Sequence, residues 1–69
     1  MCTYKVLFEN NKAVSATQLL YPESEDLIFV EEKNGIKYLR WLCVEIEDEQ
    51  SAIDLANQTL IEYGDAFLA

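Results

Sequence analysis

The segment DLIFVEEKNGIKYLRWLCVEIE, residues 26–47, decides the fold, because two strand-like runs flank a single turn signal within it. That signal is Asn34-Gly35, and both positions of a tight two-residue turn favour residues that adopt a positive φ. The segment therefore predicts an antiparallel hairpin that turns at Asn34-Gly35.

This turn sets the register of the hairpin. The pairs that follow from it are Lys33/Ile36, Glu32/Lys37, Glu31/Tyr38, Val30/Leu39, Phe29/Arg40 and Ile28/Trp41. Glu32 and Lys37 are an opposite-charge pair across the strands, and Phe29 opposite Arg40 allows a cation–π contact. Both pairings are favourable and neither depends on the Asn-Gly signal, so they support the register.

In this register both faces of the hairpin are rich in apolar side chains. One face holds Ile28, Val30, Leu39, Trp41 and Cys43; the other holds Leu27, Phe29, Ile36, Tyr38, Leu42, Val44 and Ile46, with Glu31 and Arg40. A single helix covers only one face of a small antiparallel sheet, and the other face is normally polar. We therefore expect either residues 13–21 or a second subunit to cover the second face, since exposed apolar patches mark interaction sites.

The hairpin register also separates core residues from candidate contact residues. Trp41 and Cys43 are expected in the core, where cysteine behaves as a small hydrophobe. Tyr21 and Tyr38 are the candidate aromatic contacts of a binding surface, because tyrosine is enriched at binding hot spots.

The N-terminal part of the chain predicts a further strand. Residues 3–9 alternate between apolar and polar side chains, apart from Leu7, which is typical of a half-buried strand. Asn10-Asn11 suits a tight turn, because asparagine tolerates the left-handed backbone. The next stretch fits either a second strand over residues 13–20 or a short helical turn over residues 15–21, and Pro22 ends either one.

From Asp48 onward the apolar period becomes that of an amphipathic helix. The apolar stripe comprises Ala52, Leu55, Ala56, Thr59, Leu60, Tyr63 and Phe67. Asp48 suits the N-cap with Ser51 as a competing cap, and Gly64 is a natural stop that leaves residues 65–69 as a tail. We predict an α+β fold in a single domain, residues 1–69. Its small antiparallel sheet has three to four strands, and one C-terminal helix packs on one face.

Charge is distributed unevenly along the chain. The net charge is −8, and all five basic residues lie in the first forty positions. Residues 41–69 contain seven acidic residues and no base. This half is unsuited to direct contact with nucleic acid or an anionic membrane, because phosphate contacts require Lys and Arg. It favours a protein partner with a basic surface, or serves solubility.

The candidate binding residues are acids around and after the strand-to-helix junction. They are Glu45, Glu47, Asp48, Glu49, Asp54 and Glu62. Clustered carboxylates can bind Ca²⁺ or Mg²⁺, but the spacing of a twelve-residue calcium loop with its central glycine is absent, so no metal site is predicted. Acids in the first turn of a helix also stabilise its dipole, and exposed acids are commonly just solvated charge.

Catalysis is not expected. The chain has no His, which is the usual general base near neutral pH, and its two glycines form no phosphate-binding loop. A nucleophilic role for Cys2 lacks a His partner as well. We expect no cofactor, reduced thiols and a cytoplasmic protein, since neither a signal peptide nor a membrane span is visible in the sequence.

These observations favour a small acidic, non-catalytic protein-binding module. Its more specific form is an inhibitor or adaptor that docks its acidic C-terminal half on a basic, nucleic-acid-binding surface. In size and charge alone, the chain is similar to the nucleic-acid-mimicking inhibitors that phages make. The alternatives are a homodimeric structural or assembly domain joined through the second apolar sheet face, and an accessory subunit of an enzyme complex.

Overall fold

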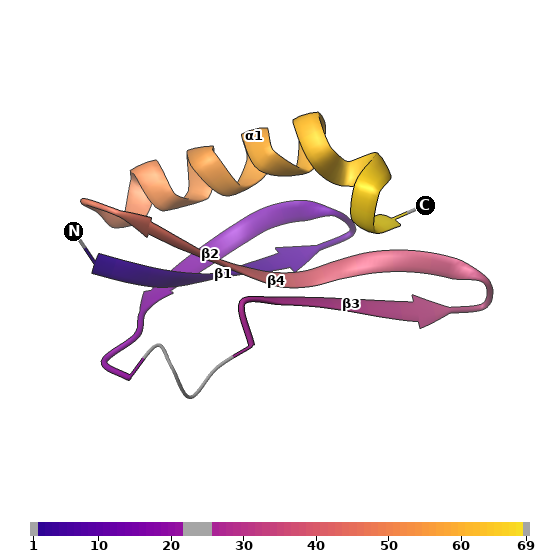
Figure 1. The fold of residues 1–69 in the computed structure, drawn as a ribbon, viewed down its shortest axis with the longest axis horizontal. Helices are drawn as coiled ribbons and strands as arrows, with labels where there is room; N and C mark the ends of the chain where they lie inside the picture. The colour runs from indigo at the N-terminus through magenta and orange to yellow at the C-terminus, as the bar shows by residue number, and fades with distance from the viewer. Residues whose placement is uncertain (1, 22–25, 69) are drawn as a thin grey trace.

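The computed structural model describes residues 2–21 and 26–68 and shows the predicted α+β fold (Figure 1). Its elements are β1 (Cys2–Glu9), β2 (Lys12–Gln18), β3 (Ile28–Lys33), β4 (Ile36–Ile46) and α1 (Glu49–Leu68). The strands form one antiparallel sheet in the order β2-β1-β4-β3. The helix lies along one face of this sheet, as Figure 1 shows. Residues 12–18 form a strand, so the helical-turn alternative for this stretch is wrong there, and Pro22 lies outside the described residues.

Both hairpins turn where the sequence predicts. Asn10 and Asn11 have φ values of 54° and 61°, and Asn34 and Gly35 have values of 56° and 79°. Two consecutive positive φ angles match the right-handed twist of the flanking strands, which is why these residue types occupy the turns.

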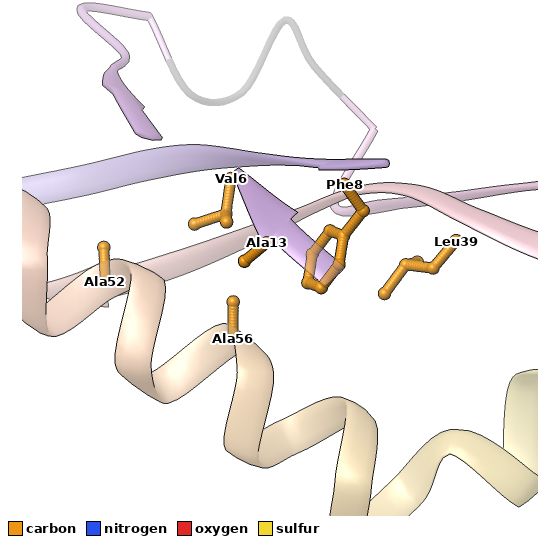
Figure 2. Close-up of a cluster of buried hydrophobic side chains, with 6 residues drawn as sticks. All are labelled: Val6, Phe8, Ala13, Leu39, Ala52 and Ala56. Atoms are coloured by element: carbon orange, nitrogen blue, oxygen red, sulfur yellow. The ribbon is translucent and has the colours of Figure 1, made fainter. Parts of the chain in front are cut away.

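The core lies between α1 and the sheet and combines one large side chain, Phe8, with small and medium ones. The buried apolar residues are Val6, Phe8, Ala13, Leu39, Ala52 and Ala56 (Figure 2). Ala52 and Ala56 face the sheet one helical turn apart, and their short side chains let the helix backbone approach it closely. The helix contacts β2, β4 and β1, so it joins the N-terminal hairpin to the C-terminal one.

The predicted register is correct near the turn and wrong beyond it. Lys33/Ile36 through Val30/Leu39 pair as expected, but then Phe29 pairs with Trp41 and Ile28 with Leu42. Arg40 is therefore an extra residue in β4, a β-bulge, which changes the face to which the following residues point. After the bulge Leu42, Val44 and Ile46 pack toward α1, whereas Trp41 and Cys43 lie on the opposite face. The expectation that Trp41 and Cys43 belong to the core is wrong for this reason.

Two asparagine side chains complete the hydrogen bonding around irregular strand pairing. β2 also shifts register, which leaves Val14 between the pairs Leu7/Ser15 and Phe8/Ala13. Next to it, the Ala13 N–H donates to Asn57 Oδ1 of α1 at 3.0 Å. The Leu39 N–H lies past the last β1–β4 pair and donates to Asn11 Oδ1 at 2.9 Å. Side-chain amides here take the place of ladder partners.

The helix is longer than the sequence predicts. It continues through Gly64 to Leu68, so Gly64 is not the stop. A glycine inside a helix costs about 1 kcal/mol relative to alanine, and this cost does not end α1 at Gly64, which is buried. No helix in the described ranges is both long and apolar enough to cross a membrane.

Candidate binding surfaces

Asp48 is a helix cap, as predicted. The Ser51 N–H donates to Asp48 Oδ1 at 2.8 Å, and the Ser51 hydroxyl donates to Asp48 Oδ2 at 3.1 Å. The Asp48 carbonyl accepts from the Ala52 N–H at 3.0 Å, which closes the first helical turn. Both carboxylate oxygens are engaged within the chain, so the helix start accounts for this acid, and Ser51 is a partner of the cap rather than the cap.

The junction acids act on Tyr4, which lies on the helix-facing side of β1. Partial burial, followed by the charges of Cys2, Asp48 and Glu49, raises the pKa of Tyr4 above its ordinary value of 10.0. The negative charge at the N-terminal end of the helix therefore affects the ionisation of a phenol in β1.

The remaining candidate acids do not form one surface. Glu45 pairs with Thr3 across the sheet and alternates with Val44, which packs on the core, so Glu45 faces away from α1. Asp54 and Glu62 are exposed on the helix, where they accept hydrogen bonds from Gln50 at 3.2 Å and Gln58 at 3.1 Å. The sheet separates Glu45 from these two helical acids.

The other exposed acids lie along α1 or just before it, on the side of the sheet where the helix packs. We call them the acidic helix side and define it as Glu47, Glu49, Asp54, Glu62 and Asp65, all exposed on α1 or at its start. The predicted acidic surface therefore loses two of its residues: Glu45 lies on the opposite face of the sheet, and Asp48 is the helix cap.

The face of the sheet opposite α1, here called the open sheet face, is the second apolar face that the sequence predicts, but the bulge at Arg40 changes which residues of β4 lie on it. Alternation and strand pairing place on it Thr3, Lys5, Leu7, Glu9, Lys12, Val14, Ser15, Thr17, Phe29, Glu31, Lys33, Ile36, Tyr38, Arg40, Trp41, Cys43 and Glu45. No element of the described chain packs across this face as α1 does across the other. Residues 13–21 are one of the two predicted covers of this face, but residues 12–18 form the edge strand β2 instead.

An aromatic cluster lies at the centre of the open sheet face. Phe29 and Trp41 stack with ring centroids 4.6 Å apart, and the Lys5 Nζ lies 4.0 Å from the centroid of the Trp41 ring. The predicted cation–π pair of Phe29 with Arg40 is replaced by this contact between Lys5 and Trp41. The shift in the β3–β4 pairing that creates it carries no signal in the local sequence pattern.

The connector between β2 and β3 meets one end of the open sheet face. The Asp26 carbonyl accepts hydrogen bonds from Trp41 Nε1 at 3.1 Å and from Cys43 Sγ at 3.5 Å. Figure 1 shows the described parts of this connector on the side of the sheet away from α1. The Trp41 ring is thus contacted at its Nε1 edge by the backbone of Asp26 and on its plane by Phe29 and Lys5, so contacts within the chain set its orientation.

The two predicted tyrosine contacts differ in their setting. Tyr38 is half-buried on the open sheet face and lines a shallow hollow of about 320 Å³ with Arg40 and Ile36. A second hollow of about 520 Å³ lies beside it, along Lys5, Leu7, Val14, Arg40 and Trp41. Tyr21 is exposed in the connector, away from the hollows. Only Tyr38 joins the surface that the structure builds.

Within the described residues, no three Cys, His, Asp or Glu side chains gather closely enough to hold a metal ion. Comparison with models of protein families, with curated proteins and with solved structures found no match.

Proposed function

We propose that this chain is a non-catalytic protein-binding module. The observation that carries the proposal is the apolar exposure of the open sheet face. There Leu7 and Phe29 are each 39% exposed, Val14 is 53% exposed and Ile36 is 55% exposed. An antiparallel sheet that packs on one side normally presents a polar second face, and a contiguous apolar patch bordered by charges is typical of an interaction site.

The centre of this face has the properties of a binding hot spot. Hot spots are enriched in Trp, Tyr and Arg, and the face holds Trp41, Tyr38 and Arg40 together. The Phe29–Trp41 stack and the hydrogen bond from Trp41 to Asp26 already order the largest side chain. A partner that packs on it therefore has less side-chain entropy to remove.

A second form of the proposal uses the acidic helix side. An inhibitor or adaptor of this kind would dock these carboxylates on a basic, nucleic-acid-binding surface, as nucleic-acid-mimicking inhibitors of phages do. Its support is the exposure of Glu49, Asp54 and Glu62 in a stretch of 29 residues, 41–69, that contains no base. Binding through this side would weaken with salt, because exposed charge pairs are screened.

Affinity capture with surface variants tests the proposal and separates the two forms. The immobilised chain is compared with Leu7→Glu on the open sheet face, with Glu49→Lys/Glu62→Lys on the acidic helix side, and with Ile61→Glu as control. Ile61 is 83% exposed on α1 and is not part of the core cluster.

The two forms give different patterns. A protein retained at high salt and lost only with Leu7→Glu supports binding through the open sheet face. One released by salt and lost with the double Lys variant supports the acidic form. The proposal is wrong if, at low and high salt, the wild type retains neither another protein nor added copies of the chain itself that one of these variants fails to retain.

A further inference from the structure

We infer that the open sheet face takes a second copy of this chain, with the two sheets packed face to face and the two helices on the outside. The inference rests on the proposed function, because it names the occupant of the same face. Two sheets that pack in this way lie about 10 Å apart with their strands roughly aligned.

The distribution of charge favours a second copy. Four of the five basic residues, Lys5, Lys12, Lys33 and Arg40, lie on the open sheet face, together with three of the thirteen acids, Glu9, Glu31 and Glu45. The other ten acids and one base lie elsewhere in the sequence. Two chains that each carry a net charge of −8 repel one another in most relative orientations. The repulsion is smallest when they meet through this nearly neutral face.

The charges of the face are also suited to a two-fold arrangement. In a two-fold dimer the same patch meets itself, so the patch has to be self-complementary. Because both signs border the apolar centre, a two-fold axis along the strands sets β1 and β2 of one copy over β4 and β3 of the other. Glu9 and Lys12 then meet the region of Glu31, Lys33 and Arg40. A face of one sign would not allow this.

The size of the domain and of the face point the same way. Among the residues whose burial is described, the core cluster contains six buried side chains, three of them alanines, and a chain of this length is marginally stable unless oligomerisation, metals or disulfides help it. Four strands span about 19 Å, and six residues along a strand span about 20 Å. This footprint of roughly 400 Å² is smaller than the about 600 Å² of accessible surface per partner that the smaller specific interfaces bury. We therefore expect a weak, concentration-dependent dimer.

Such a dimer has a consequence for the acidic helix side. With the sheets together, both helices face outward, so two copies of this side point in opposite directions. The dimer could then engage two basic surfaces at once, and the gain from linking two sites depends on whether both can be reached together.

Sedimentation over a concentration series tests the inference. We expect wild type and Ile61→Glu to dimerise alike, and Leu7→Glu and Leu7→Lys to shift toward monomer with association weakened more than about tenfold, because either variant buries an unpaired charge. Testing both signs matters, since Leu7→Lys lowers the net negative charge and so cannot act by general repulsion. Circular dichroism checks that each variant folds.

A measurement on the wild type needs no variant. Trp41 is the only tryptophan, and on dilution its fluorescence should move to longer wavelength as the open sheet face becomes solvated. The inference is overturned if the wild type stays monomeric, if its fluorescence does not shift on dilution, or if the Leu7→Glu variant dimerises as well as the wild type. If the monomeric wild type still captures a protein that the Leu7→Glu variant does not capture, the protein-binding proposal is supported and the dimer inference is wrong. A monomer that captures nothing overturns both.

Discussion

Phe29 and Trp41 stack with 15° between their ring planes and 4.6 Å between their centroids, because Arg40 is an extra residue in β4. If β4 had no bulge, the register set by the Asn34-Gly35 turn would place Arg40 opposite Phe29 and point Trp41 toward α1. A single-residue bulge thus moves the only tryptophan of the chain from the core to the open sheet face and brings Leu42 and Val44 into contact with the core.

Removal of the helix cap is expected to destabilise the fold. In Asp48→Ala the Ser51 N–H and hydroxyl lose their partners, and the loss of an N-cap costs about 0.5–2 kcal/mol. Chemical denaturation measures the free energy of unfolding. Asp48→Asn keeps an oxygen that can accept the bond and should cost less. The neighbouring exposed Glu47→Ala should change stability by less than about 0.5 kcal/mol. Equal losses for Asp48→Ala and Glu47→Ala would contradict the capping role.

The bond between Asn57 and Ala13 is expected to tie α1 to the edge strand β2. Asn57→Ala leaves the buried Ala13 N–H without its acceptor, at a cost of about 1–3 kcal/mol. Amide hydrogen exchange at Ala13 should accelerate in this variant. Asn57→Asp retains an oxygen at the same place and should slow the exchange again. Unchanged protection of Ala13 in Asn57→Ala would show that the bond does not hold the strand.

Truncation of the central core side chain is expected to approach the limit of the fold. Leu39 is among the largest fully buried side chains, and Leu→Ala changes in cores cost about 2–5 kcal/mol. A domain of this length has a total stability of roughly 3–10 kcal/mol, so thermal unfolding of Leu39→Ala should occur at a much lower temperature or be absent. The matched truncation Ile61→Ala, at an exposed site, should leave the transition nearly unchanged.

Substitution of Gly35 by a residue that disfavours positive φ is expected to destabilise the fold. Gly35 has a φ of +79°, and a Cβ built there would meet nothing within 4 Å. The penalty for Gly35→Ala is therefore conformational, about 1 kcal/mol or somewhat more. Gly35→Asn should cost less, because asparagine adopts this backbone more readily. If denaturation shows the two variants to be equally stable, the turn does not need the left-handed conformation.

Stability is expected to fall at alkaline pH through Tyr4. Its pKa is raised above 10.0 in the folded chain, so the folded state holds the phenolic proton more tightly than the unfolded state does. The resulting stabilisation is fully present below pH 10 and is lost as the pH rises from there through the folded pKa. Denaturation curves from neutral to alkaline pH measure this loss.

The junction charges make that prediction specific. Glu49→Gln should lower the pKa of Tyr4 toward 10.0, because it removes one of the nearby negative charges, whereas Glu62→Gln, farther along the helix, should not. Absorbance titration of the tyrosines follows the change. A Tyr4 titration that is the same in wild type and Glu49→Gln would show that the junction charge does not reach it.

The candidate surface shows where local patterns were sufficient and where they were not. Asp48 could be assigned as a cap from the sequence, because capping depends on residues within one helical turn. The acids Glu45 and Asp54 could not be assigned to opposite sides of the molecule, since their separation depends on how the strand that carries one packs against the helix that carries the other. Lys5 and Trp41 are 36 positions apart, and only the pairing of β1 with β4 brings them together.

The sequence by itself determined the elements whose causes are local: the turns at Asn10-Asn11 and Asn34-Gly35, the start of α1 at Asp48, and the change from strand to helix periodicity. Only the tertiary structure decided the bulge at Arg40, the face occupied by Trp41 and the continuation of α1 past Gly64. A change of register exchanges the two faces of a strand, and its free energy depends on the hydrogen bonds and packing of neighbouring elements. In this chain those neighbours are β1 and α1, which favour Leu39 and Leu42 beneath the helix and leave Trp41 on the open sheet face.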